Sequence, residues 1–193
     1  MELIPVSNIV SGTMFIWTEI WLTVGILVLL LLSLSKKLER EYTLMASVAV
    51  FFLLSGAGIL YYTNVLQRPI MFPEQQAGPM DMGNDNQMLF VDGLGTFFKF
   101  LLLFAGAATV LISSRSKQLL KNFHAEYHSL IITLVIGGML MVSSMDLLMI
   151  FLAIEFVSII SYVMPGLQKA SPKASEASAK YMLYGGVTSG LLM

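Results

Sequence analysis

The chain has 193 residues, of which 56% are hydrophobic and only 12% are charged, and its mean hydropathy is +0.79. Soluble domains carry about 25% charged residues, so this composition excludes a soluble globule. The absence of cysteine excludes a disulfide framework, a thiolate metal site and iron–sulfur ligation by this chain. A formal net charge of -1, without a tract rich in lysine and arginine, excludes nucleic acid as a partner.

Apolar runs of membrane-spanning length follow one another along the chain. A helix needs about 20 mostly apolar residues to cross a bilayer, because lipid offers no partner to a free backbone amide or carbonyl. Five runs qualify, at 15–34, 44–65, 89–112, 128–144 and 146–166, and a sixth begins near Glu176 and is still apolar at Met193. We therefore predict an all-α, polytopic membrane protein with five full transmembrane helices and a sixth truncated at the C-terminus. No internal repeat divides it, so residues 1–193 are expected to form a single transmembrane helical domain.

The basic residues indicate how these spans are oriented. Lysine and arginine in short loops resist translocation and stay on the cytoplasmic side. Eight of the 11 basic residues follow the first, third and fifth spans: Lys36, Lys37, Arg40, Arg115, Lys117, Lys121, Lys169 and Lys173. The loops on the opposite side hold only Arg68. We therefore expect the N-terminus to face outward.

Glu155 is a carboxylate deep inside the fifth span. It follows Asp146 by nine residues, which at about 1.5 Å per residue puts it near the bilayer midplane. An ionised residue there costs about 2.5–3.5 kcal/mol on insertion scales, so Glu155 must be protonated, paired or beside water. Ser158 and Tyr162 share its helical face. A buried, protonated glutamate that joins two helices by a hydrogen bond is one interpretation, and a residue on an ion or proton path is the other.

Three further charged residues lie in or at the ends of spans. Lys99 follows Asp92 by seven residues. Its side chain either contacts a neighbouring part of the protein, reaches toward water along its long stem, or has a functional role. Lys180 has Glu176 at i−4, so a surface ion pair at a helix start explains both residues. Glu19 lies beside Trp17 and Trp21 in the first turns of its span, and we interpret it as an anchor at the outer interface.

Other patterns carry weaker indications. His124 and His128 are spaced i, i+4, as in some helical metal sites, but only Glu126 is nearby, so solvated interfacial histidines are favoured over a metal site. The pairs Gly137-Gly138 and Gly185-Gly186 lack the context of a phosphate-binding loop and are typical of close helix approach.

Residues 126–166, EYHSLIITLVIGGMLMVSSMDLLMIFLAIEFVSIISYVMPG, followed by SEASAKYMLYGGVTSGLLM at 175–193, are similar to a known family. They resemble the antiporter-like membrane subunits of respiratory complex I, the proton-pumping NADH:quinone oxidoreductase. The segment FVDGLGTFFK at the start of the third span fits the same family, whereas the first two spans match it loosely. The resemblance implies that this chain is the N-terminal portion of a longer antiporter-like subunit.

The resemblance also implies roles for individual residues. A glutamate on the family's fifth helix belongs to the proton path and falls on Glu155, and the lysine of the EAxxKY pattern falls on Lys180. Lys99 is a weaker candidate for the same path. The family's pumping lysines on the seventh and later helices have no counterpart in this sequence.

The family's activity sets the expected partners. Other membrane subunits of complex I and the lipid bilayer of a bacterial inner membrane would surround the chain, which itself holds no cofactor or metal. NAD, FMN, iron–sulfur clusters and quinone would be bound elsewhere in the complex. Two alternatives remain: a subunit of a multi-chain sodium/proton antiporter, and a membrane scaffold that conducts nothing.

Overall fold

A computed structural model of the chain describes residues 17–34, 42–62, 93–114, 124–167 and 171–192. These residues form six α-helices and one short 3-10 helix, and no strand occurs among them. The elements are α2 (Trp17–Ser33), α4 (Tyr42–Tyr61), α6 (Gly93–Ser113), α7 (His124–Ser143), α8 (Leu147–Val163), η3 (Met164–Leu167) and α9 (Pro172–Leu192). The prediction of an all-α chain is confirmed.

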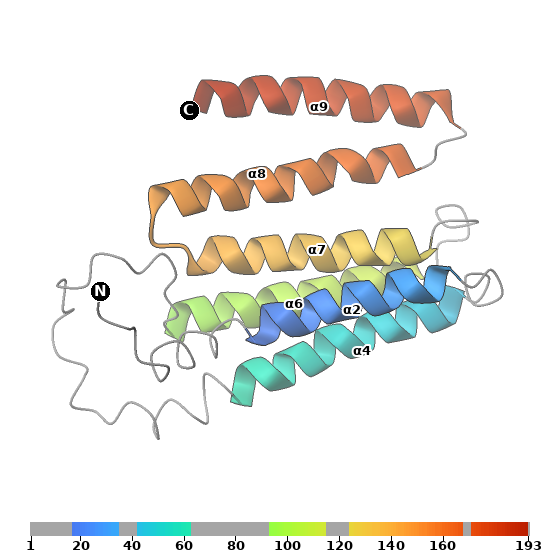
Figure 1. Cartoon of the computed structure of the whole chain (residues 1–193), viewed down its shortest axis with the longest axis vertical. Helices are drawn as coiled ribbons and strands as arrows, with labels where there is room; N and C mark the ends of the chain where they lie inside the picture. The colour runs from blue at the N-terminus through green and yellow to red at the C-terminus, as the bar shows by residue number, and fades with distance from the viewer. Residues whose placement is uncertain (1–16, 35–41, 63–92, 115–123, 168–170, 193) are drawn as a thin grey trace, which may run out of the picture.

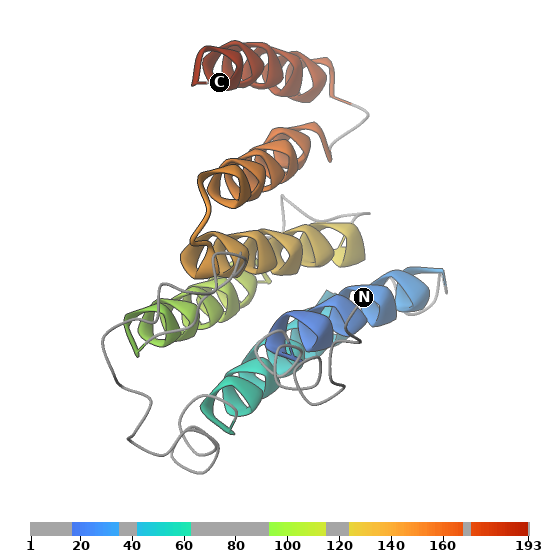
Figure 2. The same ribbon diagram turned by 60° about the vertical axis from the view of Figure 1, so that its left-hand side comes forward.

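The helices fall into a compact group and a row. Helices α2, α4, α6 and α7 pack against one another, whereas α8 lies on α7 and α9 lies on α8, as Figures 1 and 2 show from two directions. Helix α8 contacts the four-helix group mainly through α7. Helix α7 therefore connects the four-helix group to α8.

One apolar cluster holds the four-helix group together. Its fully buried members include Leu22 and Leu29 of α2, Leu53 of α4, and Ile132 and Met139 of α7. In contrast, the only buried residues of α8 are Ala153 and Ile160. Most side chains of α8 and α9 are thus exposed in this chain, although α8 is built largely from apolar residues.

Length and composition support membrane insertion. Three of the helices are long and apolar enough to cross a bilayer: Gly93–Ser113, Ala125–Ser143 and Leu147–Leu167. The helices Trp17–Ser33 and Ala46–Tyr61 are apolar but shorter within the described residues. The fold is that of a polytopic helical membrane protein, as predicted.

The helix bounds differ from the predicted spans in an informative way. Helix α7 begins at His124 and α9 at Pro172, each four residues before the apolar run that predicted it. Proline is well suited to the first position of a helix, where its missing amide proton would have no helical partner. In both cases a polar first turn therefore extends the helix beyond the run that predicted it.

Glycines let the row of helices pack closely. A Cβ atom added to Gly137 of α7 would lie 2.7 Å from Cγ2 of Val157 on α8. A Cβ atom on Gly185 of α9 would overlap the hydroxyl of Tyr162, whereas one on Gly186 would meet nothing within 4 Å. The predicted close approach is confirmed for Gly137 and Gly185, and the prediction is wrong for Gly186, which faces open space.

We predict that Gly185→Leu disrupts the packing of α9 on α8, while Gly186→Leu does not. Both substitutions add the same helix propensity, so the difference between them isolates the contact with Tyr162. Overpacking of this kind costs about 1–3 kcal/mol. Thermal unfolding of the full-length protein in detergent should show a lower midpoint for Gly185→Leu, and equal midpoints for the two variants would contradict the packing described.

Candidate functional site

Glu155 lies in the middle of α8 and is partly buried. Its atom Oε1 is shielded from solvent and has no hydrogen-bond partner among the described residues. Apolar side chains surround it along the helix: Leu152, Ile154 and Phe156 are exposed by 52%, 40% and 39%. A buried carboxyl oxygen costs free energy unless it has a hydrogen-bond partner, so this atom of Glu155 calls for a partner from outside these residues.

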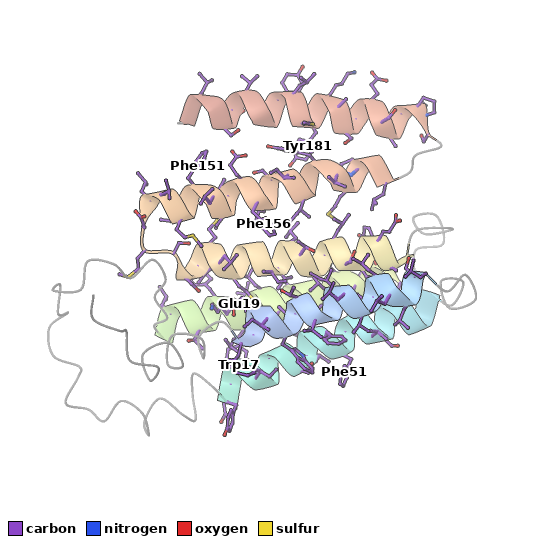
Figure 3. The ribbon with its side chains drawn as sticks, in the orientation of Figure 1. Trp17, Glu19, Phe51, Phe151, Phe156 and Tyr181 are labelled. Atoms are coloured by element: carbon purple, nitrogen blue, oxygen red, sulfur yellow. The ribbon has the colours of Figure 1, made fainter. Side chains whose placement is uncertain are left out.

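Hydroxyl groups gather between α8 and α9 on the C-terminal side of Glu155. The Ser161 hydroxyl donates to the Tyr181 hydroxyl at 3.4 Å, and Ser178 donates to the backbone oxygen of Tyr162 at 2.7 Å. The rings of Tyr162 and Tyr181 meet edge to face with centroids 4.9 Å apart. Figure 3 shows Tyr181 pointing from α9 toward α8 and Phe156 pointing from α8 toward α7. Ser161 and Tyr162 of this interface lie within about two helical turns of Glu155 on α8.

Lys180 is in an exposed ion pair. Its ammonium donates to Glu176 Oε1 at 2.5 Å, and the two side chains are exposed by 63% and 62%. The pair is the i, i+4 pair on one helix that the sequence predicts. No contact between Lys180 and Glu155 is found in the described part of the chain.

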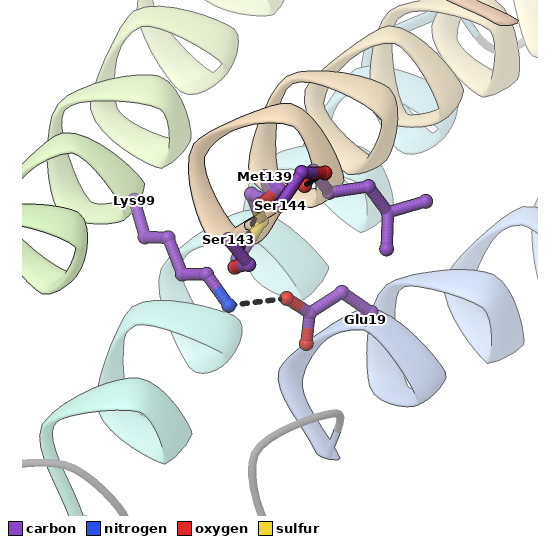
Figure 4. Close-up of polar contacts among 6 residues, drawn as sticks. Glu19, Lys99, Met139, Ser143 and Ser144 are labelled. Atoms are coloured by element: carbon purple, nitrogen blue, oxygen red, sulfur yellow. Dashed lines mark hydrogen bonds and ion pairs between the residues drawn. The ribbon is translucent and has the colours of Figure 1, made fainter. Parts of the chain in front are cut away.

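Lys99 is in a buried ion pair with Glu19. Its ammonium donates to Glu19 Oε1 at 2.6 Å across 80 positions of sequence. The two residues are exposed by only 1% and 5%. Figure 4 shows the pair between α6 and α2, with Ser143 of α7 beside it. Asp92, the residue that the sequence set beside Lys99, lies outside the described residues.

The interpretation of Glu19 as an interfacial anchor is wrong. The side chain points into the four-helix group rather than toward the outer interface, and it pairs with Lys99. Trp21 is not a free belt residue either, because its indole donates to Ser55 of α4 at 2.8 Å. The position of a residue along the chain does not show which way its side chain faces, since a residue in the first turn of a span can face lipid, water or a neighbouring helix.

A signal for the ion pair was nevertheless present in the sequence. Glu19 is two residues into α2 and Lys99 six residues into α6, which gives depths of about 3 and 9 Å. Both helices were expected to enter from the same side of the membrane. Opposite charges near the same end of two spans therefore favoured pairing, although sequence could not show that α2 and α6 lie close enough for it.

His128 is buried rather than solvated. It is fully inaccessible on α7, so the expectation that it is solvated is wrong. The side chain of His124 lies outside the description. No group of three or more metal-ligating side chains occurs among the residues that the structure describes.

Comparisons with known proteins assign the class. Residues 144–193 match the family model described as "NADH:quinone oxidoreductase/Mrp antiporter, TM", and these residues include α8, Glu155 and α9. This part of the chain is thus similar to the antiporter-like transmembrane proteins. The resemblance predicted from the sequence is confirmed.

Curated relatives extend the similarity to nearly the whole chain. It is 36% identical to NADH-quinone oxidoreductase subunit N of Anaeromyxobacter sp. (strain Fw109-5), over 91% of this chain and 31% of that protein. It is 34% identical to subunit N of Chlorobium chlorochromatii (strain CaD3), over 97% of this chain and 34% of that protein. Subunit N of Pelagibacter ubique (strain HTCC1062) is 34% identical, over 93% and 35%. The chain spans about a third of the length of these relatives.

We predict that Lys99→Met destabilises the protein by about 3–5 kcal/mol, because it leaves the Glu19 carboxylate buried without a partner. The double variant Glu19→Gln, Lys99→Met should recover most of this loss. Lys180→Met is the matched control, since breaking an exposed pair costs about 1 kcal/mol or less. The free energy of unfolding in detergent is measured for all three variants of the full-length protein. Equal losses for Lys99→Met and Lys180→Met would contradict a buried pair.

Proposed function

We propose that this chain is part of a proton-translocating membrane subunit of an NADH:quinone oxidoreductase, with Glu155 as a protonatable site on the proton path. The observation that carries the proposal is the shielded Oε1 of Glu155, which has no partner among the described residues and lies in the segment that matches the antiporter family. The relatives supply the activity: their printed names are those of NADH-quinone oxidoreductase subunits.

A carboxyl group in this setting can gain and lose a proton as its surroundings change. Burial favours the neutral acid, and an ammonium group brought near favours the carboxylate. Quinone reduction elsewhere in the complex would move such charges, and each proton is moved against about 2.3 kcal/mol per 100 mV of membrane potential. Glu155 then binds a proton in one state and releases it in the other.

Lys180 is the proposed neighbour of this site on α9. The hydroxyl groups of Ser161 and Tyr181 lie between α8 and α9. Tyr181 directly follows Lys180 in the sequence. The exposed pair with Glu176 leaves the Lys180 ammonium free to change partners at little cost. We assign Lys180 to the proton path on this basis, and Lys99 to a separate place in the same subunit.

The small number of buried residues on α8 indicates what surrounds the chain. Its buried residues are Ala153 and Ile160, so most of its apolar surface needs lipid or protein around it. We propose that residues 1–193 act as one transmembrane domain beside other membrane subunits of the complex in a bacterial inner membrane, with the N-terminus outside. NAD, FMN, iron–sulfur clusters and quinone would bind to other parts of that complex.

A second candidate function is a subunit of a multi-chain sodium/proton antiporter. The matching family model includes such antiporters in its description. The two functions differ in their energy source, because the antiporter exchanges ions in membranes without NADH. A scaffold that conducts nothing would leave both activities unchanged on replacement of Glu155.

We predict that Glu155→Gln in the full-length subunit lowers the number of protons pumped per NADH oxidised, because glutamine cannot carry the proton. The measurement is proton uptake by vesicles containing the reconstituted complex, alongside NADH oxidation. Asp146→Asn is the matched control: it removes an exposed acid at the start of the same helix, where the side chain makes no capping hydrogen bond. Unchanged pumping by Glu155→Gln would remove Glu155 from the path.

A further inference from the structure

We propose that Glu19 and Lys99 form a second proton-exchange site, separate from Glu155, which water reaches through a groove between α6 and α7. The pair lies in the four-helix group, where α2 and α6 begin, whereas Glu155 lies on α8 beyond α7. The proposal does not require this chain to belong to a pump. It concerns what the pair itself can bind and release.

The hydrogen bonding of the pair is incomplete. Lys99 donates to Glu19 Oε1 at 2.6 Å, but Glu19 Oε2 is buried and has no partner in the part of the chain that the structure describes. A buried carboxylate held only for stability normally has both oxygens hydrogen-bonded. The vacant acceptor is therefore the atom at which a proton or a water molecule would bind.

Stability alone is also a weak reason for such a pair. Well-packed apolar side chains of similar size often stabilise a buried site as well as an ion pair does, because both charges lose their hydration. The four-helix group that encloses the pair also holds fully buried apolar side chains, among them Leu22 and Met139. Two charges at this position are better explained by a change of protonation than by packing.

A groove on the surface lies near the pair. It has a volume of about 400 Å³ and is lined by Gly95 and Phe98 of α6 and by Met141 and Ser143 of α7. Gly95 precedes Lys99 by one helical turn on the same face. Figure 4 shows Ser143 beside the Lys99 ammonium. The groove and the ion pair thus share Ser143 as a common wall.

In the proposed exchange the pair gains one proton and later releases it. In the resting form the Lys99 ammonium and the Glu19 carboxylate sum to zero charge. A proton delivered by water in the groove binds Glu19 Oε2, which gives a neutral acid beside an ammonium and a net charge of +1. Return of that proton to the groove restores the ion pair.

Few other titratable groups within the described residues can interfere. The described side chains of α2 and α6 hold only Glu19 and Lys99. On α4, Tyr61 and Tyr62 are exposed by 50% and 55%. On α7, Glu126, Tyr127 and His128 lie toward the opposite end, about 22 Å or more from Ser143 along the helix. Asp146, just past the end of α7, is exposed.

Infrared spectroscopy can detect the added proton directly. The full-length protein in its native membrane complex is titrated with acid in H₂O and in D₂O, and the spectra of Glu19→Gln and Glu155→Gln are subtracted from that of the parent. We expect a carboxylic acid C=O band that appears on acidification, shifts in D₂O, is lost in Glu19→Gln and persists in Glu155→Gln. A spectrum without a band specific to Glu19 at any pH in which the protein is folded would overturn the proposal.

The groove can be tested with single cysteines and a hydrophilic thiol reagent, leaving the ion pair intact, with the labelled parent protein as the baseline, because residues 1–193 contribute no cysteine. Met141→Cys should be labelled, because Met141 lines the groove and is 45% exposed, and labelling should slow the deuterium shift of the Glu19 band. Ala107→Cys is the control, because Ala107 is 4% exposed in the apolar cluster and does not line the groove. Failure to label Met141→Cys, or labelling without any effect on the exchange of Glu19, would rule out the groove as the route.

Discussion

A chain in lipid must satisfy every backbone amide and carbonyl internally, and this constraint shapes the whole protein. Long helices meet the constraint within each segment, which leaves side-chain packing to decide how the segments are arranged. In lipid the apolar surface gains little from helix association, so close approach and polar contacts become important. The glycine contacts of α7 and α9 and the ion pair of α2 with α6 are contacts of these two kinds.

The two groups of charges differ in their surroundings. Glu19 and Lys99 are enclosed by four helices that share one apolar cluster, so their positions are fixed by many neighbours. Glu155 lies on a helix with few buried residues, and the rest of its environment comes from outside the described residues. An enclosed pair suits a local exchange with water, whereas a carboxyl group on an open helix face suits a partner on another helix or chain. The two sites are therefore not interchangeable in any mechanism.

Sequence predicted the candidate site unevenly, and the reason differs from residue to residue. Glu155 could be found because a charge at mid-depth of an apolar run is costly wherever the helix packs. Lys180 and Glu176 could be paired because their contact is within one helix. Glu19 was misassigned because its partner lies 80 residues away, and the depth of a residue does not say which neighbour it faces. His128 was misassigned for the same reason, since its burial depends on the helices that pack around α7.

By itself, the sequence determined the helical membrane class, the approximate spans and the family, because hydropathy and local motifs depend only on residues near one another in the chain. It also placed Glu155 in the middle of its apolar helix. Only the tertiary structure decided that α2, α4, α6 and α7 form the enclosed group and that Lys99 meets Glu19 inside it. Which faces of two helices meet depends on side-chain packing between segments far apart in the chain, and an apolar run that is hydrophobic all round does not specify its inward face.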